Sequence, residues 1–222
     1  MDNKNETMLK ALSDGNISML IMAVSEGADV NLKDEDGRTP LMKASKKGYR
    51  DMVSYLLEKG AKVDDRDKNN KTALMGAAKN GYSDIIKFLI DKGCDVNARD
   101  NNGRTALMRA SFLGHLGSVE RLVEAGANVN DTDNKGRTSL MDAVNAVKPE
   151  VMSYLIEKGA DVNAQDNEGT TCLMRAAYGG YEDMVQYLLN KGADKYIKDN
   201  EARMAVHYVR TENLNVLQDL LK

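Results

Sequence analysis

The sequence is poor in the residues that catalysis and metal binding usually need. It has two histidines, His115 and His207, more than ninety positions apart. No nucleophile with a nearby base can be assembled from them, and neither a glycine-rich phosphate loop nor a Cys/His metal spacing occurs. We therefore expect no catalytic residues, no metal site and no cofactor.

Cysteines and long apolar runs are scarce as well. Cys94 and Cys172 fall in the third and sixth of the repeat units described below, too far apart for a disulfide, which indicates two reduced thiols in a reducing compartment. The apolar run at 19–24 is too short for a signal peptide or a membrane span. We expect a cytoplasmic protein without membrane contact, with leaderless secretion into a host cell as an alternative.

Linker-like sequence is also lacking, since there are only two prolines and no Ser/Gly-rich stretch. Instead, the motif Thr-x-Leu-Met-x-Ala returns every 33 residues, at 39–44, 72–77, 105–110, 138–143 and 171–176. A fixed period of this length indicates a stack of similar supersecondary units. We predict one domain, 1–222, with units at approximately 1–33, 34–66, 67–99, 100–132, 133–165, 166–198 and 199–222.

The sequence of each unit predicts two short helices followed by a turn. In the second unit Thr39 can cap a helix that begins at Pro40, and Gly48 can end it. A second helix starts near Asp51, and Gly60 suits the left-handed residue after it. The remainder is a projecting turn. The spacing predicts that the second helix buries Met52, Val53, Leu56 and Leu57.

With Thr-Pro-Leu-x-x-Ala at 39–44 and Gly-Ala-Asp-Val-Asn at 27–31 and 159–163, the chain resembles the ankyrin-repeat family. The resemblance implies an all-α repeat solenoid of seven ankyrin repeats, each a helix-turn-helix with a projecting β-turn or hairpin, whose N- and C-terminal units act as caps. It also implies a concave surface that binds proteins.

Three departures from the family pattern predict local differences. Methionine replaces the motif histidine in five units, a form similar to bacterial members. Val147 replaces the glycine that ends the first helix of the fifth unit, so we expect that turn to deviate. In the seventh unit, His207 takes the methionine position with a side chain that can be buried, and the second helix, with Val216 and Leu217, fits the pattern after a one-residue deletion.

Charge is distributed unevenly over the repeat. The positions that the family exposes on its concave face carry 18 of the 31 lysines and arginines but only five of the 34 acidic residues. A chain with a formal net charge of −3 is therefore expected to have one basic face, which would attract an acidic partner.

An interaction of this kind also needs an apolar anchor. Phe112 and Leu113 stand where other units have lysine or asparagine, Tyr178 is at the equivalent site two units later, and Arg109 and Arg175 precede them. The alternative is that Phe112 packs against the neighbouring unit. The candidate partner-binding residues are Lys43, Lys46, Lys47, Lys68, Lys79, Arg99, Arg104, Arg109, Phe112, Leu113, Arg175 and Tyr178.

The sequence thus predicts a non-enzymatic protein–protein interaction module or scaffold, monomeric alone, that binds an acidic protein segment. Nucleic-acid binding through the basic face is an alternative, against which stand the acidic balance of the chain and the lack of repeated aromatic residues for base stacking. A second alternative is a secreted bacterial effector that acts as an adaptor in a host cell.

Overall fold

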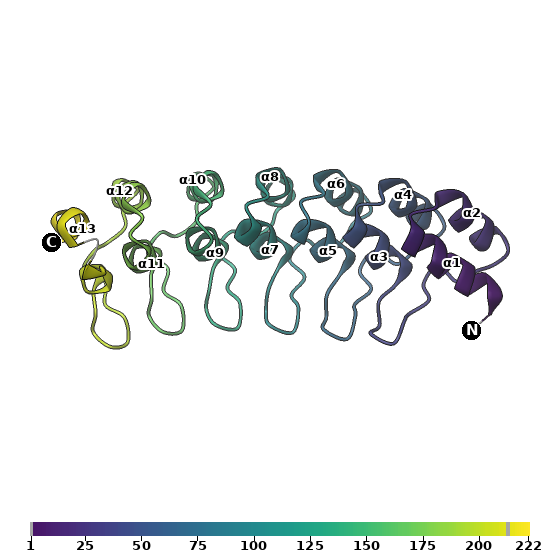
Figure 1. The fold of residues 1–222 in the computed structure, drawn as a ribbon, viewed down its shortest axis with the longest axis horizontal. Helices are drawn as coiled ribbons and strands as arrows, with labels where there is room; N and C mark the ends of the chain where they lie inside the picture. Colours follow the sequence, from purple (N-terminus) through teal and green to yellow (C-terminus); the bar gives the residue numbers. More distant parts are fainter. Residues whose placement is uncertain (1, 212–213) are drawn as a thin grey trace. The chain divides into compact units, whose positions relative to one another are not determined.

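A computed structural model describes residues 2–211 and 214–222. Over these residues the chain forms short α-helices joined in pairs, with a turn projecting after each pair (Figure 1). The described residues contain no β-strand, and their one isolated bridge joins Thr132 to Thr138 across a projecting turn. The predicted all-α repeat stack is confirmed, and the projecting segments are turns rather than hairpins of paired strands.

The chain divides into two compact bodies, each made of several repeats and described by itself. They are called unit 1 and unit 2, and the 33-residue units are called repeats from here on. Unit 1 comprises residues 1–106 and 117–127, and unit 2 comprises residues 107–116 and 128–222. The helices of unit 1 are α1 (Asn3–Asp14), α2 (Ile17–Ser25), α3 (Pro40–Lys47), α4 (Arg50–Glu58), α5 (Ala73–Lys79), α6 (Ser83–Asp91) and α8 (Leu116–Glu124). Those of unit 2 are α7 (Ala106–Leu113), α9 (Ser139–Asn145), α10 (Pro149–Glu157), α11 (Cys172–Gly179), α12 (Glu182–Asn190), the 3₁₀ helix η1 (Ala205–Tyr208) and α13 (Leu214–Leu221).

The recurring threonine begins the first helix of a repeat. Its hydroxyl accepts a hydrogen bond from the backbone N–H three residues later, at 3.3 Å for Thr39 and 3.4 Å for Thr72. Thr138 and Thr171 do the same in unit 2. A capped N-terminus satisfies a backbone donor that would otherwise be orphaned, so the motif specifies where each first helix starts.

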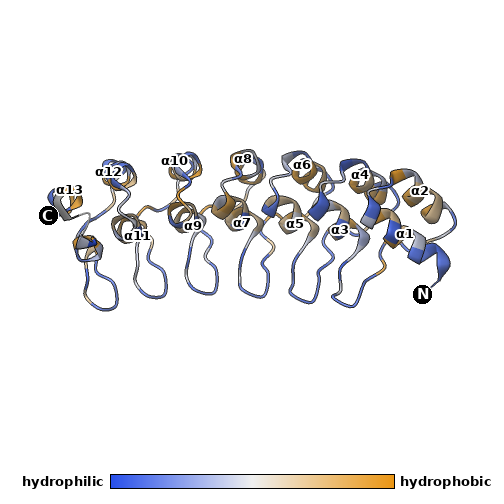
Figure 2. Cartoon of the chain, viewed as in Figure 1, coloured by the Kyte–Doolittle hydropathy of each residue, from blue (hydrophilic) through white to orange (hydrophobic). Residues whose placement is uncertain are grey.

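Leucine, methionine and alanine of the same motif form the core. Met75, Met108, Met141 and Met174 are at most 2 % exposed, and the alanine two positions after each is fully buried. On the second helix, Met52, Val53 and Leu56 are buried, but Leu57 is only partly buried, contrary to prediction. In Figure 2 the hydrophobic colouring is concentrated on the helices, which also carry hydrophilic segments, whereas the projecting turns are mostly hydrophilic.

The expectation that Val147 makes its turn deviate is wrong. Val147 takes the left-handed conformation, with φ of 55°, where Gly48 has 79°. The N–H of Lys148 bonds to the carbonyl of Ala143 at 2.9 Å, as the N–H of Tyr49 bonds to Ala44. The backbone therefore follows the repeat, and the valine bears strain that a glycine would not.

Replacing Val147 by glycine is expected to stabilise the protein by about 1 kcal/mol. A left-handed β-branched residue costs about 1–2 kcal/mol, part of which is offset by the greater freedom of glycine in the unfolded chain. Val147 is 42 % exposed, so little packing is lost. Urea denaturation measures the gain. Val147→Ala is the control, because alanine keeps the Cβ and much of the strain; an equal gain from alanine would contradict the explanation.

In the seventh repeat the buried residues of the second helix follow the 33-residue period, without the one-residue deletion that the sequence predicted. Leu217 and Leu221, which lie 165 positions after Met52 and Leu56, are 1 % and 3 % exposed, whereas Val216 is 49 % exposed. The first helix of this repeat is reduced to the single 3₁₀ turn η1, and Met204 stands where other repeats have the capping threonine. His207 is exposed rather than buried, and its Nδ1 accepts the N–H of Met204 at 2.9 Å.

Candidate functional site: the face formed by first helices and turns

The projecting turns are each built around one aspartate, which is buried in all of them except the turn of the partly buried Asp34. In every case its Oδ1 accepts backbone N–H groups two and four residues later; for Asp133 these are Lys135 at 2.8 Å and Arg137 at 3.0 Å. The same pair of bonds closes the turns at Asp34, Asp67, Asp100, Asp166 and Asp199. Each turn is therefore a rigid loop that holds its tip residues in place.

Basic residues of the predicted face neutralise these aspartates. Lys43 Nζ lies 2.8 Å from Asp34 Oδ2, and the guanidinium of Arg175 pairs with Asp166 Oδ2. In the fifth turn Arg137 donates from Nε and Nη2 to Asp133. Lys43 and Arg175 were predicted to bind a partner, but their charge is largely engaged in holding the turns, a role that the sequence analysis did not give them.

The ionisation of these carboxylates reflects both burial and hydrogen bonding. Burial opposes ionisation of Asp133, but the side-chain hydrogen bonds from Arg137 and the backbone N–H groups of Arg137 and Lys135 outweigh it and lower its pKa. For Asp34, burial is likewise outweighed by Lys43 and the turn backbone, which lower the pKa of that carboxyl. Both groups are therefore ionised at neutral pH.

In unit 1 the first helices and turns present a lysine-rich surface. Lys46 on α3 and Lys68 in the next turn are exposed, and neither side chain forms an ion pair or hydrogen bond within the described residues. Lys47 donates to the carbonyl of Ser13 at 2.8 Å. Lys79, Arg99 and Arg104 belong to the same surface and each has a polar or ring partner.

In unit 2 the equivalent surface is apolar and aromatic. Phe112, Asn145 and Tyr178 occupy the same position of three successive repeats, on α7, α9 and α11. Phe112 is 45 % exposed, Leu113 39 % and Tyr178 55 %. About half of the Phe112 residue is therefore open to solvent, and the rest is covered by the protein. Arg109 is half-buried on the same helix.

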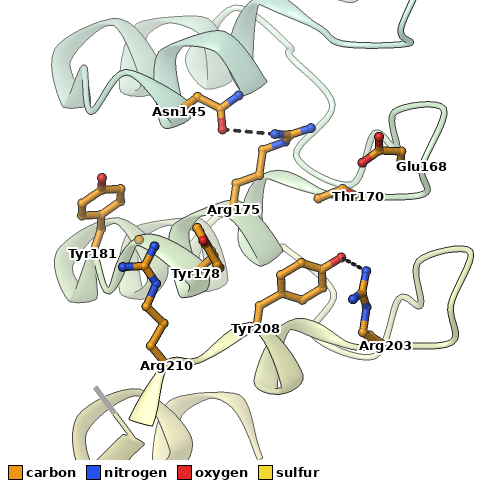
Figure 3. Close-up of a pocket in the computed structure, with 10 residues that line it drawn as sticks. Asn145, Glu168, Thr170, Arg175, Tyr178, Tyr181, Arg203, Tyr208 and Arg210 are labelled. Carbon is orange, nitrogen blue, oxygen red and sulfur yellow. Dashed lines mark hydrogen bonds between the residues drawn. The ribbon is translucent and has the colours of Figure 1, made fainter. Parts of the chain in front are cut away.

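A pocket of about 520 Å³ lies beside this row in unit 2 (Figure 3). Its walls come from the sixth and seventh repeats and from Asn145 at the end of α9 in the fifth. The guanidinium of Arg210 lies over the ring of Tyr178, with Cζ 4.1 Å from the ring centroid. The ring of Tyr181 packs against Gly179, where no room is left for a Cβ. The lining residues are Asn145, Glu168, Thr170, Arg175, Tyr178, Gly179, Tyr181, Arg203, Tyr208 and Arg210.

The shortened first helix of the seventh repeat helps to form this pocket. Arg210 occupies the position of Ala177 in the repeat before, a residue that is fully buried inside α11. Because η1 ends at Tyr208 and the chain then becomes extended, Arg210 is exposed rather than packed in a helix. Tyr208 takes the place of Arg175, and its hydroxyl donates to Asp199. The signal for the pocket was the loss of the capping threonine at Met204.

The two cysteines do not contribute to this face. Both are free and buried, and burial is the main reason why the pKa of each thiol is raised to about 12. A thiol with such a pKa is protonated at neutral pH and is a poor nucleophile. Across the described residues there is no cluster of three His, Cys, Asp or Glu side chains that could hold a metal ion. None of the helices described there has the length and apolar character to span a membrane.

Comparison with known proteins agrees with this architecture. A family model for ankyrin repeats in three copies matches residues 7–100, 63–133, 97–166 and 119–199. The chain therefore belongs to the ankyrin-repeat family. Among solved structures it is similar to the ankyrin repeat domain of Bcl-3, a member of the IκB protein family, with 25 % identity, a TM-score of 0.83, and coverage of 96 % of this chain and 97 % of that one. No curated protein sequence matches the chain.

Proposed function

We propose that this ankyrin-repeat protein is a non-enzymatic interaction module that binds an acidic segment of a protein partner on the face formed by its first helices and turns. The observation that carries the proposal is the exposed row in unit 2. Phe112, Leu113 and Tyr178 are large apolar or aromatic side chains, between 39 % and 55 % exposed. Phe112 and Tyr178 share one repeat position, which is lysine or asparagine in the second, third and fifth repeats, and Leu113 occupies the next position. Partly exposed aromatic residues are typical anchors of interfaces.

In unit 1, the electrostatics of the first helices and turns support an acidic partner. The aspartates at the centres of the turns are buried or partly buried and already hydrogen-bonded, so they present little negative charge to a ligand. The acidic residues that remain exposed at the turn tips are Glu35, Asp36, Glu168 and Glu201. Exposed lysines such as Lys46 and Lys68 attract carboxylates over about a Debye length, roughly 8–10 Å at physiological salt. Their contribution is to the association rate and to partner choice, whereas the apolar row supplies the affinity.

Replacing Phe112 by alanine is expected to weaken partner binding by more than about tenfold, because a half-exposed phenylalanine at an interface is worth more than 1.4 kcal/mol when it is buried. Arg109→Ala is expected to act in the same direction. The measurement is capture of the partner from the native cell, followed by titration of the purified partner against the wild type and each variant.

The matched control is Gln186→Ala, an exposed polar residue on the second helix α12 of the same unit. It should leave binding unchanged. Equal affinity of wild type, Phe112→Ala and Arg109→Ala would refute the site assignment. Micromolar binding of an unrelated oligonucleotide, with a steep dependence on salt, would instead assign nucleic acid to the lysine-rich surface.

A further inference from the structure

The turn aspartate of the third repeat, Asp67, lacks the side-chain partner that its counterparts have. In four other turns the side chain of a lysine, an arginine or a tyrosine binds Oδ2 of the aspartate: those of Asp34, Asp133, Asp166 and Asp199. Oδ1 of Asp67 accepts the two backbone N–H groups of its turn, but Oδ2 has no hydrogen bond or ion pair within the described residues. Asp67 is only 8 % exposed, and a buried carboxylate without an ion pair is unfavourable.

Gly76 accounts for the missing partner. The residue nine positions after the turn aspartate is Lys43 in the second repeat and Arg175 in the sixth, and both reach the aspartate from the first helix. In the third repeat this position is Gly76, which has no side chain. Because Oδ1 of Asp67 makes the same two bonds as in the other turns, its Oδ2 faces the same position of the first helix. Oδ2 is not fully enclosed, so a ligand can reach it.

The fold itself does not require a glycine at this position. Gly76 lies inside α5, and its φ is not in the left-handed region. A Cβ built on it would be 3.5 Å from the Cβ of Lys46, which is ordinary van der Waals contact with the neighbouring helix α3 (Figure 1). A glycine inside a helix is less stable than an alanine. The absent side chain therefore leaves room over α5, next to a carboxylate, that the packing of the protein does not use.

Exposed lysines without partners surround this room. They are Lys46 on α3 and Lys68 and Lys71 in the turn, and none of their side chains forms an ion pair or hydrogen bond within the part of the chain that the structure describes. The tip of the turn carries Asn69 and Asn70, so it adds no acidic group. A segment bound here meets one negative charge among several positive ones. Its complement has one positive charge between negative ones.

We infer that a lysine or arginine side chain of the partner segment lies across Gly76 and pairs with Asp67, while acidic residues on either side of it in the segment pair with Lys46 and Lys68. The inference rests on the proposed function in one respect, because it assumes that the ligand is an acidic protein segment. It adds that the segment is recognised by a pattern of charge, one basic residue between acidic ones, and not by negative charge alone.

The experiment uses the full chain and two short peptides, so it needs no identified partner. One is acetyl-Glu-Asp-Lys-Asp-Glu-amide, and the other has a neutral glutamine in place of the lysine. Binding is followed by NMR through the backbone amide signals of residues 66–80. Attraction to lysines alone favours the glutamine peptide, which has the larger negative charge. We expect the opposite order: a Kd on the order of 1 mM for the lysine peptide, and binding about fivefold weaker for the glutamine peptide.

Variants locate the basic residue of the peptide. Asp67→Asn removes the carboxylate, and Gly76→Lys supplies from the chain the ammonium group that Lys43 supplies in the second repeat. Each should abolish the preference for the lysine peptide. The matched control is Gly76→Ala, which adds only a methyl group and should keep the preference. Asp51→Asn removes an exposed carboxylate from α4 of the same unit and should change either Kd by less than about twofold.

Thermal unfolding tests the unpaired carboxylate without any ligand. Gly76→Ala should raise Tm by roughly 2–4 °C, because alanine is favoured over glycine inside a helix. Gly76→Lys should raise it further, since the new ammonium group pairs with Asp67. A gain from Gly76→Lys that does not exceed the gain from Gly76→Ala would show that Asp67 does not accept a cation from this position, and would overturn the inference.

Three binding results would also overturn it. They are the absence of any shift at roughly 10 mM peptide, binding of the glutamine peptide as tight as that of the lysine peptide, and a preference for the lysine peptide that survives in Asp67→Asn. If these tests fail while partner capture stays sensitive to Phe112→Ala, the proposed function stands. If the peptide preference holds while capture is insensitive to Phe112→Ala and Arg109→Ala, the site assigned under the proposed function is refuted and the one at Asp67 is not.

Discussion

Replacing Asp133 by asparagine is expected to lower the free energy of unfolding by about 3 kcal/mol. The carboxylate is buried, accepts two backbone N–H groups through Oδ1 and pairs with Arg137 through Oδ2. Asparagine has the same size, but its NH₂ group is a donor where the carboxylate has an acceptor. When this NH₂ group faces the guanidinium, Arg137 has no ion-pair partner and the hydrogen bonds that close the turn are weakened. Urea denaturation at pH 7 measures the loss.

The control is Glu157→Gln, which removes one exposed negative charge at the end of α10 and should change stability by less than about 0.5 kcal/mol. The pH dependence gives a second check. Because the pKa of Asp133 is lowered in the folded protein, its stabilisation is present above the unfolded value of about 4 and is lost as the pH falls through the folded value. The difference between wild type and Asp133→Asn should therefore shrink below pH 4; a difference that stays constant down to pH 2 would contradict the role of ionisation.

Replacing Gly169 by alanine is expected to cost about 3 kcal/mol. Gly169 has φ of 76°, and a Cβ placed on it would lie 2.9 Å from the backbone nitrogen of Asn200 and 2.9 Å from the Cα of Asp199. These are backbone atoms of the next turn, which is itself fixed to this one by the hydrogen bond from the N–H of Asn200 to the carbonyl of Glu168 at 3.1 Å. The extra methyl group must push two turns apart.

Gly159→Ala separates the two causes of this loss. Gly159 also has a positive φ, 89°, but a Cβ there would meet no atom within 4 Å. Its replacement should therefore show only the conformational cost of about 1 kcal/mol. If both variants lose the same free energy of unfolding, the close contact between the two turns is not the reason why Gly169→Ala is destabilising. Thermal or urea unfolding of the two proteins side by side decides this.

The repeat architecture could be predicted from the sequence because each local signal agrees with the others. Thr39 caps, Pro40 begins the helix, Gly48 ends it, and the buried methionines follow at one phase. The errors came where one residue departs from the consensus. Val147 keeps the backbone of a glycine because the neighbouring repeats determine the turn, and substitution alone does not show this.

The candidate site could be predicted only in outline. The exposed positions of Phe112 and Tyr178 followed from the repeat phase, and both are exposed in the structure. The pairing of Lys43 and Arg175 with turn aspartates could not be predicted by counting charges, because a count does not reveal which carboxylate a side chain reaches. The pocket could not be predicted because it depends on Arg210 leaving the helical path, and the 33-residue pattern does not indicate where the helix ends.

Local unfolding of the seventh repeat, which begins with the 3₁₀ turn η1, would remove part of the pocket. This repeat begins with a single 3₁₀ turn of four residues, held at its start by the bond from the Met204 N–H to His207 Nδ1. The repeat before begins with the eight-residue helix α11, so less free energy holds the seventh repeat closed. Arg203, Tyr208 and Arg210 belong to it, and the pocket exists only while it is docked on the sixth repeat. Fraying of the seventh repeat and occupancy of the pocket are thus linked equilibria: any ligand of the pocket would slow amide hydrogen exchange in this repeat, and anything that frays the repeat would release such a ligand.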